Sequence, residues 1–241
     1  METILVSIVI PSFNRYITLK RTVDSIKEQT YKNIEIIVVN DGSTDQRYYE
    51  NTIEGITMIN LPENSKIKFG FPNLGYVINQ GLYIAKGQYI GIIGDDDVYL
   101  PTKIEEQINV LSKNEYFICG TDGYHFHVDF DKNNLDKYSN CRYIKHMHID
   151  LYKKMLNLPL NSEFPTLWSY EMLSIHNFAI ASSIVFNRCL LESVGYFDET
   201  INVLGMEDWN YWKRAVQKVG FMYYIDKPLV AYDLSHGALN K

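Results

Sequence analysis

Apolar residues recur in short runs along the first half of the chain, and polar turn residues separate these runs. The runs at residues 5–10, 34–39 and 89–93 have the length and β-branched content of buried strands, and a shorter run occupies residues 57–60. The run at residues 34–39 is apolar at nearly every position, which is typical of a parallel sheet covered on both faces.

Amphipathic segments alternate with these strands. Apolar residues recur at helical spacing within residues 19–26, and again from Asn73 to Ala85, where Gly87 ends the pattern. Pro101 opens a further helix after the strand at residues 89–93. This order predicts a doubly wound, mostly parallel α/β sheet. In such sheets ligands bind at the carboxyl ends of the strands.

Three consecutive carboxylates, Asp95, Asp96 and Asp97, follow the strand at residues 89–93. Adjacent anions repel one another, and their ionised forms are costly to desolvate without a counter-charge. A hard divalent cation prefers oxygen ligands and keeps waters and substrate phosphates in its shell. The alternative is that one Asp caps the following helix while the others face water. We favour a metal site, because three carboxylates at the end of a buried strand fit the alternative poorly.

Composition narrows the class of protein. The 241 residues are 46% apolar and 22% charged, with a net charge of −6, which disfavours a nucleic-acid partner. The three cysteines show no paired spacing, so we expect free thiols in a reducing compartment. No apolar run approaches the ~20 residues of a membrane span, and we expect a cytoplasmic protein. The chain contains no GxGxxG and no GxxxxGK[ST] motif, which disfavours a dinucleotide site and a P-loop.

Several segments together resemble one known family. The chain contains, in order, SIVIPSFNR, IIVVNDGSTD, NLGYVINQGLYIAKGQYI, GDDDVYLP and GMEDWNYWKR. With this set it is similar to the family-2 glycosyltransferases, which have the GT-A fold. Each segment alone is weakly specific, but their order and spacing extend over almost the whole chain.

The resemblance implies an inverting, metal-dependent hexosyltransferase. Its donor would be a nucleotide-sugar, expected to be a UDP-sugar, and its cofactor a divalent metal, Mn²⁺ or Mg²⁺. The acceptor would be a hydroxyl of a glycan or lipid-linked glycan in the synthesis of cell-surface polysaccharide. An enzyme of this kind is expected in the cytoplasm, with peripheral contact at the inner face of the cell membrane.

The resemblance also assigns site residues. Asp41 matches the acidic residue that hydrogen-bonds the nucleotide base, and Asp95 and Asp96 match the family's DxD-type pair. Gly94 stands where many members carry the first Asp of that motif. The full expected donor site is Pro11, Phe13, Asn14, Asp41, Asn73, Asp95 and Asp96. The expected metal ligands are Asp96, Asp97 and His236, with Asp96 ranked first.

The second half of the chain is less regular. The residue pattern predicts a pair of strands at residues 116–128 and a further strand at residues 178–186. We expect residues 132–165 to form an excursion on the acceptor side. We expect one GT-A domain over residues 1–241. Its donor-binding half would be residues 1–115 and its acceptor-binding half residues 116–241. Trp168 is a candidate for stacking on a sugar, although core packing is the commoner fate of such residues.

Glu207 and Asp208 open a helix whose apolar side includes Trp212 and Val216. The resemblance makes Asp208 the general base and gives Glu207 an orienting or acceptor-contacting role. The alternative is structural, since carboxylates in the first turn interact favourably with the helix dipole. Two other functions remain open: a non-catalytic nucleotide-sugar-binding protein of the same fold, and a sugar-1-phosphate nucleotidyltransferase, which the absence of a Gly-rich basic loop disfavours.

Overall fold

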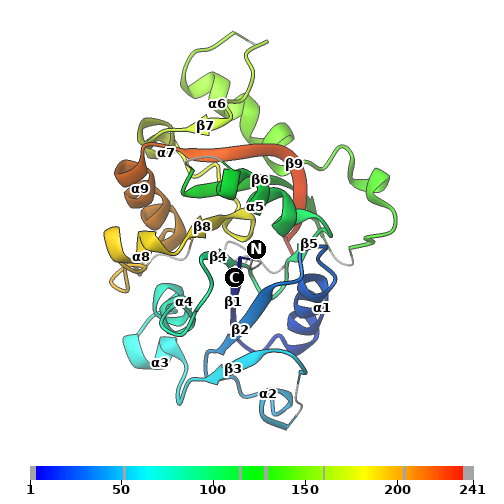
Figure 1. The fold of residues 1–241 in the computed structure, drawn as a ribbon, viewed down its shortest axis with the longest axis vertical. Coiled ribbons are helices and arrows are strands. Elements are labelled where there is room, and N and C mark those ends of the chain that lie inside the picture. Colours follow the sequence, from blue (N-terminus) through cyan, green and yellow to red (C-terminus); the bar gives the residue numbers. More distant parts are fainter. Residues whose placement is uncertain are drawn as a thin grey trace.

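The computed structural model describes residues 4–50, 53–113, 116–127, 130–159, 161–202 and 205–235, with only the backbone at residues 146 and 147. Figure 1 shows the first half of the chain, blue to cyan, below the second half, green to red. The strands of this part of the chain are β1 (Val6–Ser12), β2 (Ile34–Asn40), β3 (Thr57–Asn60), β4 (Tyr89–Ile92), β5 (Val98–Tyr99), β6 (Ile118–Phe126), β7 (Leu167–Trp168), β8 (Val185–Asn187) and β9 (Met222–Asp233).

The helices cover the sheet and carry most of the connections. The α-helices are α1 (Tyr16–Lys27), α2 (Arg47–Glu50), α3 (Ser65–Phe69), α4 (Leu74–Leu82), α5 (Lys103–Lys113), α6 (Ile149–Met155), α7 (Tyr170–Ile175), α8 (Cys189–Ser193) and α9 (Glu207–Val219). Two short 3₁₀ helices, η1 (Leu135–Tyr138) and η3 (Ala181–Ser183), and the π-helix η2 (Ile144–His148) complete the described elements. No helix within the described ranges has both the length and the apolar character that crossing a bilayer requires.

The first four strands form a parallel sheet in the order β3-β2-β1-β4. Strand β1 pairs with β2 from Val6 opposite Ile34 to Ser12 opposite Asn40. Because the strands are parallel and in register, their carboxyl ends meet at one edge of the sheet. The predicted α/β fold and all four predicted strands of this half are confirmed.

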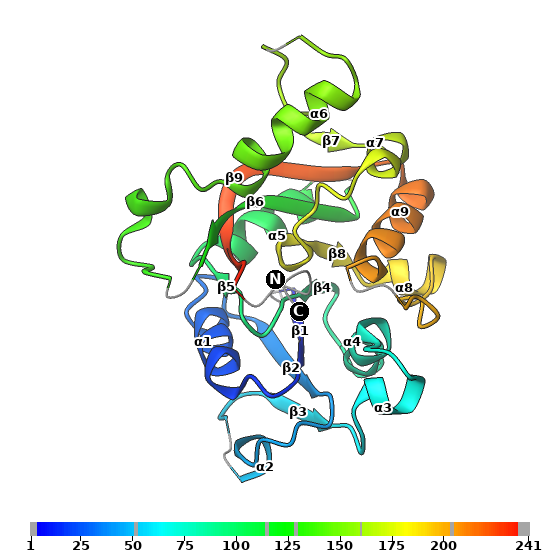
Figure 2. The ribbon, with the colours of Figure 1, turned by 180° about the vertical axis from the view of Figure 1, so that it is seen from behind.

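Alternate residues of these strands face two separate cores. Val6, Ile8 and Ile10 of β1 belong to a core shared with α1 and α5, whereas Val9 belongs to a core shared with α4. Successive side chains of a strand point to opposite faces, so a continuous apolar run requires cover on both. Figure 2 shows α1 and α4 on opposite sides of β1 and β2.

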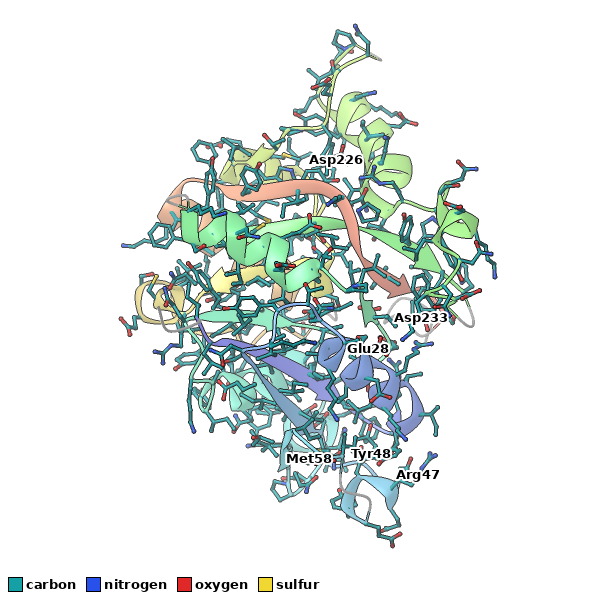
Figure 3. All side chains as sticks on the ribbon, turned by 45° about the vertical axis from the view of Figure 1, so that its right-hand side comes forward. Glu28, Arg47, Tyr48, Met58, Asp226 and Asp233 are labelled. Atoms are coloured by element: carbon teal, nitrogen blue, oxygen red, sulfur yellow. The ribbon has the colours of Figure 1, made fainter. Side chains whose placement is uncertain are left out.

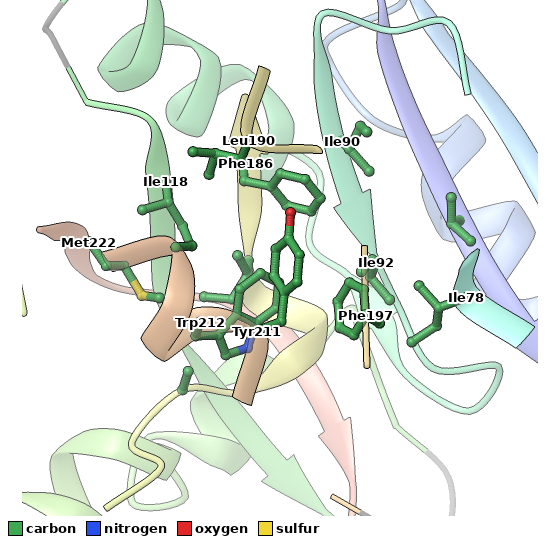
Figure 4. Close-up of a cluster of buried hydrophobic side chains, with 14 of the residues drawn as sticks. Ile78, Ile90, Ile92, Ile118, Phe186, Leu190, Phe197, Tyr211, Trp212 and Met222 are labelled. Carbon is green, nitrogen blue, oxygen red and sulfur yellow. The ribbon is translucent and has the colours of Figure 1, made fainter. Parts of the chain in front are cut away.

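The core on the α4 side also joins the two halves of the chain. Phe186 of β8 lies with Tyr211 and Trp212 of α9 and with Ile90 of β4 (Figure 4). The rings of Phe197 and Tyr211 stack with their centroids 4.4 Å apart. Each buried aromatic side chain removes about 150–250 Å² from water, so this cluster holds α9 firmly against the sheet. The first turn of α9, which carries Glu207, is thereby fixed in place.

The second half of the sheet is mixed. Strand β8 pairs antiparallel with β4 and β6, while β6 pairs parallel with β9. Strand β9 also pairs antiparallel with β5 and β7. Among the described residues this gives one nine-stranded sheet in the order β3-β2-β1-β4-β8-β6-β9-β5, with β7 beside β9. The antiparallel strand β8 therefore follows the parallel strands in the sheet, and the sheet ends with β9 beside β5.

The predicted strand pair at residues 116–128 is wrong, because this stretch forms the one strand β6. Its pairing with β9 shifts register between Thr121 and Gly123. A β-carbon at Gly123 would approach side-chain atoms of Ile180 and Val230 to 2.8 Å. A bulge with a glycine bends a strand where another backbone lies close. The stretch therefore bends one strand and does not turn between two.

The predicted strand at residues 178–186 is also wrong over most of its length, because η3 interrupts it before β8 begins. The interruption has a tertiary cause. The Oγ of Ser182 accepts a 3.0 Å hydrogen bond from the N–H of Gly94 and donates one to Asp97. These bonds tie the segment to the end of β4, where it cannot continue as a regular strand.

The predicted helices match the structure more closely than the strands predicted at residues 116–128 and 178–186. Helix α9 begins at Glu207 as expected, and α5 begins two residues after Pro101. Helix α4 ends at Leu82, so Ala85 is buried beyond its end. Trp168 is fully buried and stacks on Tyr224 with ring centroids 5.0 Å apart, so it packs in the core and is not a sugar platform.

Candidate active site

The carboxyl ends of β1, β2 and β4 bring together residues that are far apart in the sequence. Ser12, the last residue of β1, donates a 2.8 Å hydrogen bond from Oγ to Oδ2 of Asp95, which follows β4. The backbone N–H of Asp41, just after β2, donates to the carbonyl of Ser12 at 2.9 Å. This edge therefore unites Asp41 with the carboxylate run, as the fold class predicts.

The loop after β1 is clamped to the turn after β2 by Asn14. Asn14 has a left-handed backbone with φ of 53°, and its N–H donates to Ser43 Oγ at 2.9 Å. Its Oδ1 accepts the N–H groups of Thr44 and Asp45 at 2.9 and 3.1 Å. Asparagine tolerates this conformation better than most residues. The expected donor contact of Asn14 stays a prediction, and the structure gives its side chain a positioning role.

Pro11 and Phe13 lie at the end of β1 with different exposure. Phe13, which follows the strand, is 42% exposed, so its ring is available to pack against a ligand, and Pro11 is half-buried within β1. The exposed ring lies one residue after Ser12, which contacts the buried carboxylate of Asp95. This position agrees with the expected packing of this loop against a nucleotide base.

Asp41 and Asn73 are bound to their own neighbourhood. The two carboxylate oxygens of Asp41 accept the N–H and the Oγ of Ser65, each at 2.7 Å, and burial raises its pKa. Asn73 caps α4, with Oδ1 accepting the N–H of Tyr76 at 2.9 Å and Nδ2 donating to the carbonyl of Glu199 at 2.8 Å. Both polar atoms of this buried side chain are used, so its predicted donor contact rests on position alone.

Two of the three consecutive carboxylates share a partner, and the third has partners of its own. Besides Ser12, Asp95 accepts the guanidinium of Arg15 at 3.2 Å, and the same Nη1 contacts Oδ2 of Asp96 at 2.5 Å. Burial, and next the charge of Asp96, raise the pKa of Asp95 to about 6, although Arg15 opposes the shift. Asp97 turns away from this group and receives the N–H of Asp233 at 2.9 Å and the hydroxyl of Ser182.

These contacts decide how well a divalent cation fits. The described residues contain no group of three His, Cys, Asp or Glu side chains that would enclose a metal. Both oxygens of Asp97 are engaged internally, which leaves Asp96 as the best-placed carboxylate. Mg²⁺ and similar ions are commonly held by one or two carboxylates together with substrate phosphates and waters. The residues therefore fit a cation completed by a diphosphate. The third expected ligand, His236, lies outside the described residues.

On the other side of the sheet edge, α9 presents its first-turn carboxylates. Asp208 is 7% exposed, and its Oδ1 accepts the N–H of Trp209 at 2.6 Å. Asn177 donates from Nδ2 to both carboxylate oxygens at 3.3 and 3.4 Å. Burial, and next the charge of Glu207, raise the pKa of Asp208 to about 7. A carboxylate tuned to this pKa has the property that a general base needs near neutral pH.

Glu207 has a different setting. Its Oε2 accepts the N–H of Gly205 at 2.8 Å, which ties the carboxylate to the loop before α9. Burial raises its pKa, while backbone hydrogen bonds oppose the shift. The structural alternative to catalysis, an interaction with the helix terminus, applies to both residues, since Asp208 accepts a first-turn N–H of α9 and Glu207 accepts an N–H of the loop before it. The predicted roles of both residues remain predictions.

Two tyrosines lie near enough to these carboxylates to be affected by their charges. The negative charges of Asp97, Asp96 and Asp208 all add to burial in raising the pKa of Tyr232, a residue of β9. Tyr143 packs edge-on against Tyr232 with centroids 5.3 Å apart, and the charge of Asp208 also acts on it. The carboxylate run and Asp208 thus face one region.

Comparison with known proteins identifies the family. The model of "Glycosyl transferase family 2" matches residues 7–172, which is more than half of the chain. The chain belongs to glycosyl transferase family 2. An uncharacterized glycosyltransferase of Rickettsia typhi is 30% identical over 233 residues, which cover 94% of this chain and 63% of that protein.

A second relative carries a more detailed name. UDP-Glc:alpha-D-GlcNAc-diphosphoundecaprenol beta-1,3-glucosyltransferase WfaP of Escherichia coli is 38% identical over 128 residues, or 52% of this chain and 48% of that protein. The chain thus spans less than two thirds of the length of both curated relatives.

Two solved structures resemble this family 2 chain in fold. The structure of S. aureus TarS 1-349 in complex with UDP-GlcNAc matches with a TM-score of 0.67 and 16% identity, covering 97% of this chain and 59% of that one. The mannosyltransferase PcManGT from Pyrobaculum calidifontis, in complex with GDP-Man and Mn²⁺, matches with a TM-score of 0.62 and 17% identity, covering 99% and 59%. The predicted GT-A fold is confirmed.

Sequence reasoning missed several polar residues of this family 2 site. They share one feature, which is that each contacts a predicted site carboxylate from a distant element. Arg15 belonged to a recognised segment, and its position beside the loop of β1 was the available signal. Ser12 belonged to the same segment, between two predicted site residues. The others, which carried no local signal, are Asn177, Ser182 and Asp233.

Proposed function

We propose that this chain is the catalytic part of an inverting glycosyltransferase that transfers a sugar from a UDP-sugar to a hydroxyl of a lipid-linked glycan. The observation that carries the proposal is the buried carboxylate of Asp208, which Asn177 and the N–H of Trp209 hold at a pKa of about 7 that suits a general base. The charges of Asp96 and Asp208 both act on Tyr232, so the donor sugar and the acceptor hydroxyl would meet near this tyrosine. The names of WfaP and of the TarS complex support the UDP-sugar.

The base step follows from the surroundings of Asp208. Asn177 and the N–H of Trp209 hold the carboxylate by hydrogen bonds, which keeps one orientation available to the acceptor hydroxyl. Asp208 takes the hydroxyl proton while the acceptor oxygen attacks the anomeric carbon from the face opposite the diphosphate. The oxygen–carbon bond forms as the carbon–diphosphate bond breaks, so one displacement inverts the anomeric configuration.

The donor edge supplies binding and charge. Phe13 offers an exposed ring to the base of the nucleotide, and Asp41 lies at the end of β2 on the same edge. A divalent cation bound at Asp96 would stabilise negative charge on the departing diphosphate. The Mn²⁺ in the PcManGT complex supports this assignment. Asp95 is already neutralised in part by Arg15, and it fixes the loop of β1 through Ser12.

The experiment is a thermal-shift and transfer panel of UDP-, GDP- and dTDP-sugars, each with and without Mn²⁺, with a diphosphate-lipid GlcNAc acceptor. Binding to the folded state raises the midpoint of unfolding. We expect the largest shift with a UDP-sugar plus Mn²⁺, and transfer that Asp96→Ala abolishes. Asp24→Ala, at an exposed carboxylate of α1, is the matched control and should retain both.

Three outcomes would contradict the proposal. Binding without transfer to any acceptor would favour the non-catalytic alternative. Formation of a UDP-sugar from UTP and a sugar 1-phosphate would favour the nucleotidyltransferase alternative. Full transfer by Asp96→Ala without added metal would show that the donor edge is assigned to the wrong carboxylate.

A further inference from the structure

Arg15 is the cation that contacts the donor-edge carboxylates in this structure. Its Nη1 lies 3.2 Å from Oδ1 of Asp95 and 2.5 Å from Oδ2 of Asp96. The second cation of this region, Arg21, contacts the backbone carbonyl of Asp96 and the carboxylate of Asp233, so it does not take the same place. One guanidinium thus bridges the two carboxylates that the proposed function uses.

The position of Arg15 is built into the fold. Its backbone N–H donates to the phenol oxygen of Tyr48 at 3.0 Å, and the preceding residue, Asn14, is clamped to the turn after β2. With its backbone held on both sides, Arg15 reaches across from the start of α1 to the end of β4. A bridge on an anchored backbone loses less conformational freedom than a surface ion pair between two mobile side chains.

The bridge lies where a ligand can reach it. The side chains of Asp95 and Asp96 are 7% and 12% exposed, whereas that of Arg15 is 23% exposed. A divalent cation that binds Asp96 must compete for the carboxylate that Arg15 already contacts. Two cations on one carboxylate repel each other, so Arg15 weakens the binding of a metal at Asp96 until an anion with several oxygens is present to share both charges.

A diphosphate is such an anion. A guanidinium presents a planar fork of donors that matches phosphate oxygens, and it is charged at every physiological pH. We propose that Arg15 is an internal counter-ion of the donor site: it occupies Asp96 when no donor is bound, and it moves to the donor's diphosphate when the metal takes Asp96. This inference rests on the proposed function, because it assigns a ligand to the same site.

The exchange predicts coupled binding of metal and nucleotide. Without nucleotide, the metal must displace Arg15 from its shorter contact, the one with Asp96, so metal affinity is weak. With a nucleoside diphosphate present, Arg15 gains a new partner and the metal binds more tightly. Coupling of this kind is reciprocal, so the metal must strengthen nucleotide binding by the same factor.

The test is calorimetric and needs no turnover. Mn²⁺ is titrated into wild type, Arg15→Gln and Arg15→Lys without nucleotide, and UDP is then titrated in the presence of saturating Mn²⁺. For Arg15→Gln we expect Mn²⁺ alone to bind about tenfold more tightly than to wild type, and UDP to bind about tenfold more weakly. Arg15→Lys keeps the charge and should resemble wild type more closely, which also covers the case in which Arg15→Gln folds poorly.

Two controls locate the effect. Arg188→Gln removes the same charge from the exposed residue that precedes α8, and should change neither affinity. The double variant Arg15→Gln with Asp96→Ala should lose the gain in Mn²⁺ affinity, because the gain depends on Asp96.

The inference is overturned if Arg15→Gln binds Mn²⁺ no more tightly than wild type, including the case in which neither binds it without nucleotide. It is also overturned if UDP affinity is unchanged. These results are distinct from failure of the proposed function, which would appear as wild type that binds no nucleoside diphosphate even with Mn²⁺.

Discussion

The backbone N–H of Asp233 donates a 2.9 Å hydrogen bond to Oδ1 of Asp97, so the end of β9 is fastened directly to the carboxylate run. The other oxygen of Asp97 accepts the hydroxyl of Ser182, which precedes β8. One fully enclosed carboxyl group therefore joins β4, η3 and β9. Figure 3 shows Asp233 at the end of β9 that lies toward α1. This arrangement gives Asp97 a positioning role in the structure, and its role as a metal ligand stays a prediction.

The pair of variants Asp97→Asn and Asp97→Ala separates the two roles. Burial, and next the charge of Asp96, raise the pKa of Asp97 well above its usual range, so a neutral amide is a close substitute. We expect Asp97→Asn to keep the wild-type stability and Mn²⁺ affinity. Asp97→Ala leaves a buried N–H without a partner and should cost about 2–4 kcal/mol of unfolding free energy, measured by urea denaturation. Loss of Mn²⁺ binding in a stable Asp97→Asn protein would indicate that Asp97 is a metal ligand.

Asp208→Asn should separate chemistry from binding. The amide cannot accept the hydroxyl proton, so we expect turnover to fall by about 10²–10⁴-fold while nucleotide affinity stays at the wild-type value. The measurement is kcat with a competent acceptor, alongside calorimetry with UDP. An asparagine also suits a helix start, so a purely structural Asp208 would leave the rate nearly unchanged.

Glu207→Gln is the matched control for Asp208→Asn, one residue away on the same helix turn. Its amide oxygen can still accept the N–H of Gly205, so we expect a smaller loss of turnover. If Glu207→Gln loses the rate and Asp208→Asn keeps it, the base is Glu207. If neither loses it, another group accepts the proton.

The pH dependence of turnover should report the pKa of Asp208. Only the ionised carboxylate accepts a proton, so kcat/KM is expected to rise with pH and level off above about 7. Stability has the opposite sign. The folded pKa lies above the ordinary value of 3.8, so the folded protein binds the extra proton between about pH 4 and 7 and loses that stabilisation as pH rises through the window. Asp208→Asn should therefore unfold with a weaker pH dependence there, and equal slopes would contradict the assigned pKa.

Lys103 gives a prediction on stability with the reverse sign. It is fully buried, with Nζ bonded to Gln107 at 2.6 Å and lying 4.1 Å from the ring centroid of Tyr99. Burial lowers its pKa from 10.5 to about 7. Between these values the unfolded chain binds more protons, so the free energy of unfolding should rise with pH from about 7 toward 10.

Lys103→Met removes this cost. We expect the variant to be more stable than wild type by about 1–3 kcal/mol at pH 7, with a difference that shrinks toward pH 10. Chemical denaturation at several pH values measures both curves. Lys113→Met, at the exposed end of the same helix, should show no such convergence. Parallel curves for Lys103→Met and wild type would mean that the buried amine is not the titrating group.

The parallel strands of the first half and the start of α9 could be predicted from the sequence. The apolar runs of β1, β2 and β4 specify strands covered on both faces, and the helix beginning at Glu207 appears in the residue pattern alone. These features are local, because a strand or helix of sufficient length repeats its own buried positions. The same local signal placed three carboxylates at the end of β4.

The second half was harder to predict because long-range contacts override the local pattern there. Residues 178–186 have the composition of a strand, yet Ser182 leaves the ladder to bond Gly94 and Asp97, 88 and 85 residues away. Residues 116–128 contain turn-forming residues, yet β6 continues through them, with a bulge in its pairing with β9.

What each carboxylate does was decided by the tertiary structure. The sequence brought Asp95, Asp96 and Asp97 together and could not divide them, since consecutive residues share one local environment. The division comes from partners distant in the chain: Arg15 for the first two, and Asp233, 136 residues away, for the third. The sequence by itself determined that charge gathers at this edge of the sheet, because strand ends follow from apolar periodicity. Only the tertiary structure determined which carboxylate is neutralised and by which partner. The ionisation of a buried carboxylate depends on the groups that the fold brings within hydrogen-bonding distance.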